Sequence, residues 1–276
     1  MSWIEGRGSC GRVSEPLEAF RGWQERWALL AKKIERVQTT TQELQLQARL
    51  SDLDTSFILA FANAHALNFT VRSAPFFIAL YSADMVLRDG SGMATLFKLL
   101  GQPPGLNLNG TDLIPQIVRR FNGRPIAIFG TRDPHLAHGV QVIARDLAPQ
   151  SACVSAHGFL DTPAYAALAV SHRPALILLG MGMPRQEEVA VALRSMLNHP
   201  CLIVCGGAII DFLAGKTPRA PWWIRKMGME WAFRLALEPR RLFRRYVIGN
   251  PLFLGRALRL AYSTRGGVRL FKNRSD

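Results

Sequence analysis

The last part of the chain combines arginines with aromatic side chains in a pattern that suits phosphate chemistry at a lipid surface. From Lys216 onward, fifteen Lys and Arg stand against three acidic residues, so this segment holds 12 of the net charge of +14. A guanidinium can grip phosphate with two parallel hydrogen bonds, and aromatic rings settle between water and lipid headgroups. We therefore expect phosphate-bearing ligands to bind here beside a membrane. Among the basic residues lie Trp222, Trp223, Trp231, Phe233, Phe243 and Tyr246.

Two glycine-bordered segments upstream offer further polar groups. Asp89 follows an apolar run in LRDGSG and is flanked by Gly90 and Gly92, which leaves its carboxylate free to face a cleft. It could also cap the helix that follows, and the two roles can coexist. The segment GMGMPRQE, residues 180–187, follows an apolar run and opens a helix, where free N–H groups attract a phosphate. On its own, this second segment is equally compatible with a structural turn.

Short apolar runs alternate with helical segments up to about residue 215. The runs at 84–87, 125–129, 152–156, 175–179 and 201–205 predict strands, and the segments between them predict helices. Strands that are apolar on both faces and joined by helices are typical of a parallel sheet covered on both sides. We therefore predict an α/β fold, a Rossmann-like parallel sheet with helices on both faces. Ligands of such sheets bind where strands end and helices begin, which here means the loops holding Asn68, Asp89, Gly130, Gly182 and Gly206.

Both ends of the chain, and the start of the sheet region, are expected to lack this regular alternation of strands and helices. We predict one or two amphipathic helices in an N-terminal helical extension, residues 1–50. A helix over 55–63 and a short apolar piece over 65–69 then open the Rossmann-like domain, residues 51–215. Prolines interrupt the helical composition beyond it, so we predict a basic, membrane-associating helical appendage of short helices, residues 216–276. We expect the core of the sheet domain not to depend on the appendage.

The composition excludes several classes of protein. No apolar run of 18 residues is present to span a bilayer, and the N-terminus has acidic residues and no apolar signal core, so we expect a cytoplasmic protein. Nucleic acid is disfavoured as a partner, because the charge is local and no nucleic-acid-binding motif accompanies it. The predicted partner is an anionic membrane surface, and a homo-oligomer is compatible with the sequence. Cys201 and Cys205 lie in an apolar run without metal-site spacing, which favours buried, reduced thiols.

An ordered series of motifs runs through the chain: DGSG at 89–92, NGTDL at 109–113, FG at 129–130, GMPRQE at 182–187, GGAIIDFLAGKTPRAP at 206–221 and GMEWAFRLALEPRRLFRRY at 228–246. With these motifs the chain resembles the WecG/TagA/CpsF glycosyltransferase family, which makes bacterial surface polysaccharides, from about residue 52 to 253. NAHALNF and NLNGTDL are most similar to the GumM-like branch that serves exopolysaccharide synthesis.

The resemblance implies a reaction. Members of the family move a sugar, with inversion, from a UDP-sugar to a saccharide on undecaprenyl diphosphate at the cytoplasmic membrane face. The exopolysaccharide branch implies glucose as the sugar, and the alternative is N-acetylmannosamine or its uronate. A non-catalytic nucleotide-sugar- or lipid-binding protein is a further alternative. Because no D-x-D motif follows a predicted strand, we expect metal-independent transfer without a cofactor, with arginines and helix N-termini meeting the diphosphate.

The resemblance also implies site residues. Asp89 matches the proposed base, and Asn68 matches the Asn of a T-x-N turn whose Thr position is Ala66 here. His65 is a candidate for the lost hydroxyl's role, although a structural histidine is the favoured interpretation. Asn107 replaces an Arg that is common in the family. Asp112 could instead cap its helix. The residues expected to bind donor or diphosphate are Thr111, Asp112, Gly182, Pro184, Gln186, Asp211, Arg219, Arg234, Arg241, Arg244 and Arg245.

Overall fold

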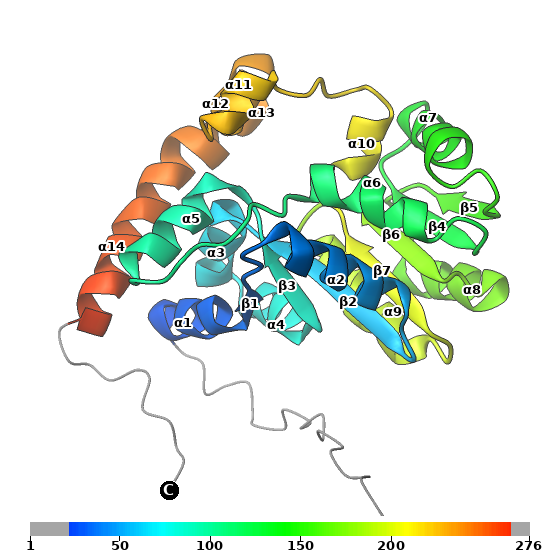
Figure 1. The fold of residues 1–276 in the computed structure, drawn as a ribbon, viewed down its shortest axis with the longest axis horizontal. Coiled ribbons are helices and arrows are strands. Elements are labelled where there is room, and N and C mark those ends of the chain that lie inside the picture. Colours follow the sequence, from blue (N-terminus) through cyan, green and yellow to red (C-terminus); the bar gives the residue numbers. More distant parts are fainter. Residues whose placement is uncertain (1–21, 266–276) are drawn as a thin grey trace, which may run out of the picture.

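A seven-stranded parallel sheet lies between two layers of helices (Figure 1) in the computed structural model, which describes residues 22–265. The strand order is β1-β3-β2-β7-β6-β4-β5, and all pairs are parallel. The predicted α/β fold with a parallel sheet is thus confirmed. The strands are β1 (Ile34–Glu35), β2 (Ser56–Ala62), β3 (Met85–Arg88), β4 (Ile126–Gly130), β5 (Cys153–Ala156), β6 (Leu176–Gly180) and β7 (Cys201–Cys205).

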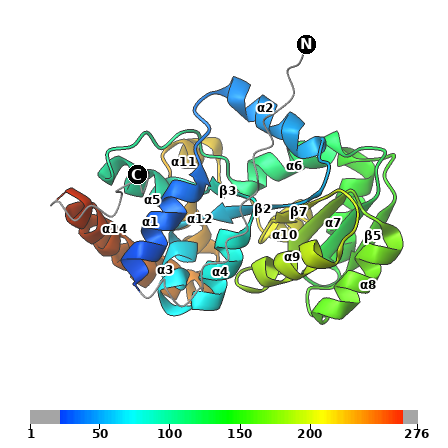
Figure 2. The same cartoon turned by 90° about the horizontal axis from the view of Figure 1, so that it is seen from below.

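Each face of the sheet has its own hydrophobic core. Successive side chains of β2 alternate between the two cores, as a strand covered on both faces requires. The first core packs against α1 (Trp23–Lys33), α3 (Ala64–Arg72), α4 (Ala74–Ser82), α5 (Gly90–Leu99), α8 (Thr162–His172), α9 (Arg185–Met196) and α14 (Gly249–Arg265). The second packs against α2 (Thr40–Ser51), α6 (Gly110–Arg120), α7 (His135–Val142) with the π-helical turn η2 (Ile143–Leu147), and α10 (Ile209–Leu213). Figure 2 views the sheet between α2 and α6 at the top and α4, α8 and α9 below.

The predicted elements at the start of the sheet region are wrong. Residues 56–62 form the central strand β2 rather than a helix, and residues 65–69 belong to helix α3. After Ser56 the segment SFILAFA is apolar on both sides, so it has no polar face to turn toward water, and the central strand buries its last five residues. The chain then turns at Asn63, whose side chain caps α3.

The N-terminal residues that the structure describes belong to the same sheet and core as the rest. Strand β1 pairs with β3 at the sheet edge, and α1 buries Trp27, whose indole N–H donates to the Leu67 carbonyl at 2.9 Å. The prediction of helices packed on the body is confirmed for α1 and α2, while residues 1–21, with Cys10, lie outside the described part. Cys201 and Cys205 are buried and unpaired, as expected.

The C-terminal segment also enters the main core. Short helices α11 (Trp222–Lys226), α12 (Glu230–Leu237) and α13 (Pro239–Phe243) form a lobe at the top of Figure 1, and the π-helical turn η3 (Arg244–Ile248) leads into α14. From α14, Phe253, Ala257 and Leu260 join the first core. The first core therefore includes side chains of the appendage. The division at residue 215 into separately folding parts stays a prediction. Within residues 22–265, no helix is long and apolar enough to cross a membrane.

Candidate active site

Asp89 lies at the carboxyl end of β3, and its carboxylate is hydrogen-bonded to the residue that follows the neighbouring strand, β2. It occupies the position before α5, but its side chain makes no capping bond to that helix. Instead the carboxylate accepts a hydrogen bond of 3.3 Å from the amide of Asn63, which directly follows β2. The other end of the Asn63 amide accepts from the backbone N–H of Ala66 at 3.0 Å. Both ends of the Asn63 side-chain amide are therefore hydrogen-bonded. Asn63 orients the half-buried carboxylate of Asp89 at the carboxyl ends of the strands.

Asn63 is the residue that sequence reasoning missed, and Asn68 is placed elsewhere. The side chain of Asn68 donates to the Gly249 carbonyl at 2.7 Å and accepts from Arg256 at 2.6 Å. Both ends of its amide are therefore engaged with α14, and the structure does not bring Asn68 to Asp89. The apolar run before Asn63 was the signal in the sequence that could have revealed this residue. Had that run been predicted as a strand, Asn63 would have been placed at the carboxyl end of a strand, as Asp89 was.

His65 lies near the start of α3, half-buried beside two arginines. Burial, then the positive charges of Arg245 and Arg72, lower the pKa of His65 to about 4. Its imidazole is therefore neutral at physiological pH. A neutral ring offers one donor and one acceptor, so His65 can hydrogen-bond a ligand without adding to the positive charge around it.

The backbone after Asp89 is fixed by polar groups from the long loop that precedes α6. The N–H of Gly90 donates to the side-chain oxygen of Asn107 at 2.8 Å. Arg88, which is buried, donates to the carbonyls of Gly90 and Gly105. Gly90 has a φ of +85°, a conformation that suits glycine. Asn107 thus has a structural task next to Asp89.

A second polar cluster lies where β4 and β6 end. The connections after these adjacent strands lead to β5 and β7 in opposite directions, the arrangement that opens a ligand crevice in parallel sheets. Beside it, Thr131 donates to the Asp211 carboxylate at 2.7 Å, and the ammonium of Lys216 lies 3.3 Å from the same oxygen. The predicted residue Asp211 therefore has two partners, Thr131 and Lys216, that sequence reasoning did not single out.

The GMPRQE segment follows β6 and ends in two buried polar residues, Gln186 and Glu187. Gly182 has a φ of +79°, and Pro184 precedes the first residue of α9. Gln186 is buried, and its amide donates to Glu187 at 2.8 Å and accepts from the N–H of Gly207 at 2.9 Å. The predicted residue Gln186 thus ties the loop after β6 to the loop after β7, inside the protein.

The Glu187 carboxyl next to Gln186 should make stability depend on pH. Burial raises its pKa from the ordinary 4.5 to about 7, although the bond from Gln186 acts in the opposite direction. The folded state then holds a proton that the unfolded state has released, so the free energy of unfolding falls as pH rises from about 4.5 through 7, by about 3 kcal/mol.

We expect Glu187→Gln to abolish this contribution, because a neutral amide of the same shape carries no titrating charge. The variant should be more stable than the parent at pH 8 and similar to it at pH 5, as measured by urea unfolding. Other titrating groups, His65 included, cancel in the comparison. The same loss of stability between pH 5 and 8 in both proteins would show that Glu187 does not titrate in this way.

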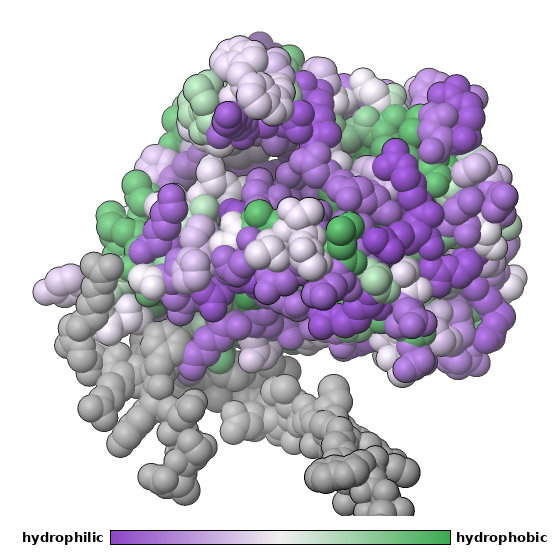
Figure 3. Space-filling model, viewed as in Figure 1, coloured by the Kyte–Doolittle hydropathy of each residue, from purple (hydrophilic) through white to green (hydrophobic). Residues whose placement is uncertain are grey.

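The appendage is attached to the body on two sides of the Asp89 region. On one side, Arg219 forms an ion pair with Asp112 at the start of α6, and Arg225 lies 3.8 Å from the same carboxylate. On the other, the Ser91 hydroxyl of α5 donates to the Gly228 carbonyl at 3.2 Å. Figure 3 shows a recess lined largely with hydrophilic residues between the α11–α13 lobe and the body below it.

Asp112 does not cap α6 with its side chain, because Asn109 does. The Asn109 side chain accepts from the backbone N–H of Asp112 and donates to its carboxylate, the latter at 2.8 Å. Thr111 lies beside them, half-buried. The structure thus brings the predicted residues Asp112 and Arg219 together.

The remaining predicted arginines divide into two pairs. Arg234 contacts Glu230 at 3.2 Å and lies over the Phe212 ring, 4.6 Å from its centroid, while Arg245 lies over Tyr246. The Nε–H groups of Arg234 and Arg245 are buried without a partner among the described residues. Arg241, paired with Glu238 at 2.8 Å, and Arg244 are exposed. Arg234 and Arg245 therefore lie against the protein, and the other two face outward.

Comparison with known proteins decides the family. The Glycosyl transferase WecG/TagA/CpsF family matches residues 27–266, which is most of the chain and includes the sheet, Asp89 and all but the last ten residues of the appendage. The chain belongs to the WecG/TagA/CpsF glycosyltransferase family. Similar proteins include those of Staphylococcus aureus strains NCTC 8325 / PS 47 and COL, each described as an N-acetylglucosaminyldiphosphoundecaprenol N-acetyl-beta-D-mannosaminyltransferase. Each is 23% identical over 197 residues, which cover 70% of this chain and 76% of the relative.

Membership in the WecG/TagA/CpsF family confirms the resemblance and makes the cluster around Asp89 a candidate active site for glycosyl transfer. Within residues 22–265, no group of three His, Cys, Asp or Glu side chains is placed to hold a metal ion. The cationic groups at hand are Lys216 at the crevice and the arginines of the appendage.

Proposed function

We propose that this protein transfers an N-acetylmannosamine-type sugar from a UDP-sugar to a saccharide carried on a polyprenyl diphosphate, with inversion. The activity named for the Staphylococcus aureus relatives supports this donor and acceptor. It favours the alternative that the sequence left open over glucose transfer in exopolysaccharide synthesis. The observation that carries the proposal is the placement of Asp89 directly after β3, where Asn63 orients its carboxylate and Ser91, two residues further, contacts the arginine-bearing lobe.

In this reaction the Asp89 carboxylate accepts the proton of the acceptor hydroxyl as that oxygen forms its bond to the anomeric carbon. The bond from the anomeric carbon to the UDP oxygen breaks on the opposite face, so the configuration inverts. A base within hydrogen-bond reach of the hydroxyl contributes about a hundred- to ten-thousand-fold to such a step. Asn63 keeps the carboxylate in place by the bond at 3.3 Å.

The departing UDP gains negative charge, which the protein must stabilise. The crevice between β4 and β6 is the proposed donor site, with Thr131, Asp211 and Lys216 around it. Lys216 is the cationic group proposed to meet the diphosphate there. Arg219 and Arg225, which share Asp112, supply positive charge from the side of the lobe.

A direct assay tests the proposal. The purified full-length protein is incubated with N-acetylglucosamine on a short-chain prenyl diphosphate and with either UDP-N-acetylmannosamine or UDP-glucose, and the products are separated by chromatography. Transfer from UDP-N-acetylmannosamine in preference to UDP-glucose is the expected result. Preference for UDP-glucose would return the assignment to the exopolysaccharide reaction, and no transfer from either would contradict the proposal.

Transfer is expected not to need a divalent metal. The cationic side chains around Asp112 and Asp211 can meet the diphosphate charge that a metal ion meets in other transferases. The initial rate in excess EDTA should therefore equal the rate in magnesium. Loss of turnover in EDTA with recovery on adding magnesium would overturn this account of leaving-group stabilisation.

We also propose that the protein acts while bound peripherally to the cytoplasmic face of the membrane. The α11–α13 lobe supports this, since Trp222, Trp223 and Met227 are all more than half exposed and lie among basic residues. Each Lys or Arg near an anionic surface contributes about 1 kcal/mol of attraction. Co-sedimentation with anionic vesicles that weakens at high salt is the expected result.

A further inference from the structure

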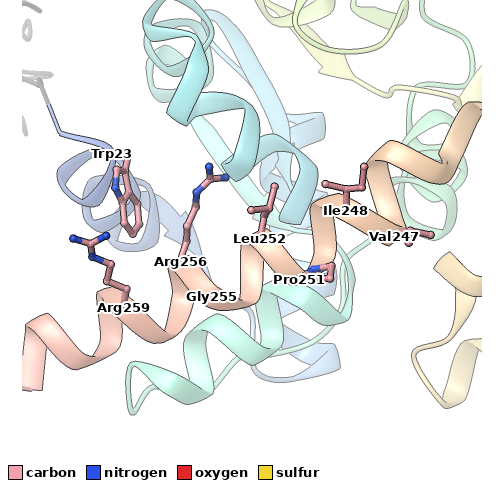
Figure 4. A pocket seen from close by; sticks show the side chains of 8 residues that line it. All are labelled: Trp23, Val247, Ile248, Pro251, Leu252, Gly255, Arg256 and Arg259. Carbon is pink, nitrogen blue, oxygen red and sulfur yellow. The ribbon is translucent and has the colours of Figure 1, made fainter.

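We propose that a groove between α1 and α14 binds the phosphorylated isoprenoid part of the acceptor. The groove is lined by Trp23 of α1 and, from η3 and α14, by Val247, Ile248, Pro251, Leu252, Gly255, Arg256 and Arg259 (Figure 4). The proposal rests on the proposed function for the identity of the acceptor. It adds a binding site for the lipid whose lining residues do not include Asp89 or Asn63.

The groove combines an apolar wall with open space. Val247, Ile248 and Leu252 are between 41% and 47% exposed, so they have apolar surface that no described part of the chain covers. A Cβ added at Gly255 would meet no atom within 4 Å, which leaves the floor of the groove open at that turn of α14. The volume of about 590 Å³ is within the range of sites that hold small organic ligands.

Positive charge without a counter-charge lies at the same groove. Arg256 and Arg259 line it, and Arg72 on α3 lies close enough to Arg256 to lower its pKa, after the larger effect of burial. Among residues 22–265, none of these three arginines forms an ion pair with a carboxylate. Like charges gathered beside an apolar wall are complementary to an anionic amphiphile, whose phosphate and hydrocarbon chain would occupy the two parts.

The groove is connected to the candidate base along one helix. Asn63, which holds Asp89, begins α3, and Asn68, which holds Arg256, lies five residues further, about 8 Å along the helix axis. His65 lies between them, with Arg245 and Arg72 nearby. In the proposed acceptor the reacting sugar, the diphosphate and the isoprenoid follow one another in that order. With the sugar at Asp89, the phosphates reach the arginines and the isoprenoid reaches Ile248 and Leu252.

The test measures binding of farnesyl phosphate to the full-length protein by isothermal titration calorimetry, below the concentration at which the lipid forms micelles. Farnesol and inorganic phosphate each lack one half of the ligand and should bind at least ten-fold more weakly. Gly255→Leu should fill the groove and weaken binding of farnesyl phosphate at least ten-fold. Because Leu favours a helix more than Gly does, the variant should stay folded.

Leu252→Glu and Leu254→Glu form a matched pair on α14, since both leucines are similarly exposed, at 41% and 44%, and only Leu252 lines the groove. We expect Leu252→Glu to weaken farnesyl phosphate binding at least ten-fold and Leu254→Glu to leave it within two-fold. Equal effects of the two changes, or binding that Gly255→Leu does not alter, would overturn the proposal. So would variants that lose binding only to phospholipid vesicles, because the surface would then be a membrane contact.

The experiments distinguish an error in the proposed lipid-binding groove from an error in the proposed transfer reaction. If farnesyl phosphate binds and Gly255→Leu blocks it, but no sugar is transferred, the groove stands and the proposed reaction is wrong. If transfer to a prenyl-diphosphate sugar proceeds with the same KM in the parent and in Gly255→Leu, the reaction stands and the groove is wrong.

Discussion

Asp89→Asn is expected to lower the rate of glycosyl transfer by about a hundred- to ten-thousand-fold while UDP binding stays within a few-fold of the parent. The amide keeps the shape of the side chain and can still contact Asn63, but it cannot accept the proton of the acceptor hydroxyl. Because the carboxylate makes no capping bond to α5, the change should cost little stability. Single-turnover rates with saturating donor, and UDP titration of the same preparation, measure the two effects separately.

Two further variants sharpen this result. Asp54→Asn removes an exposed carboxylate just before the amino end of β2, which is the end of the strand away from Asn63. This change should leave transfer unchanged. Asn63→Ser keeps an oxygen that can cap α3 but shortens the side chain and removes the amide that donates to Asp89, so it should reduce transfer less than Asp89→Asn does. Normal turnover by a folded Asp89→Asn protein would remove Asp89 from the mechanism.

The sequence was sufficient for most of the fold because five strands are short, largely apolar and separated by helices of ordinary length. The prediction failed at β2 because this strand is covered on both faces, which is also why it lies in the middle of the sheet. A strand buried on both faces has no alternation, so periodicity does not separate it from a buried helix. Strand β1 was missed because Ile34 and Glu35 continue a helical pattern and are ordered into the sheet by pairing with Val86 and Leu87.

The candidate site was predictable where a single residue follows a strand and unpredictable where residues distant in sequence meet. Asp89 could be found from LRDGSG alone. The bond from Asn63 to Asp89 depends on β2 and β3 being neighbours, and the error at β2 hid it. The pairing of Asp112 with Arg219 joins residues more than a hundred positions apart, and no local pattern indicates it. Gln186 was expected to line a pocket, but the fold buries it as a brace between two loops.

Phe253→Ala is expected to destabilise the whole protein by about 3–5 kcal/mol, the usual cost of truncating a buried phenylalanine. Phe253 lies on α14 and is only 3% exposed. Its ring centroid lies 5.3 Å from that of Trp27 on α1, and its edge would lie 3.5 Å from a Cβ at Gly92 on α5. Because Gly92 is three residues after Asp89, the cavity would loosen α5 beneath the candidate base as well as α14. Urea unfolding followed by circular dichroism measures the loss, and transfer at low temperature measures its effect on activity.

Phe243→Ala is the matched control, since Phe243 lies on α13 in the same appendage but is 51% exposed, and its loss should change stability by less than about 0.5 kcal/mol. A single cooperative transition that shifts only in Phe253→Ala would show that α14 and the sheet fold as one unit. The opposite outcome is that the parent unfolds in two separate transitions. The transition of residues 51–215 would then be the same in the parent and in Phe253→Ala. In that case the sheet domain folds alone and α14 docks onto it afterwards. The burial of Phe253 against Trp27, from the other end of the described chain, favours the single transition.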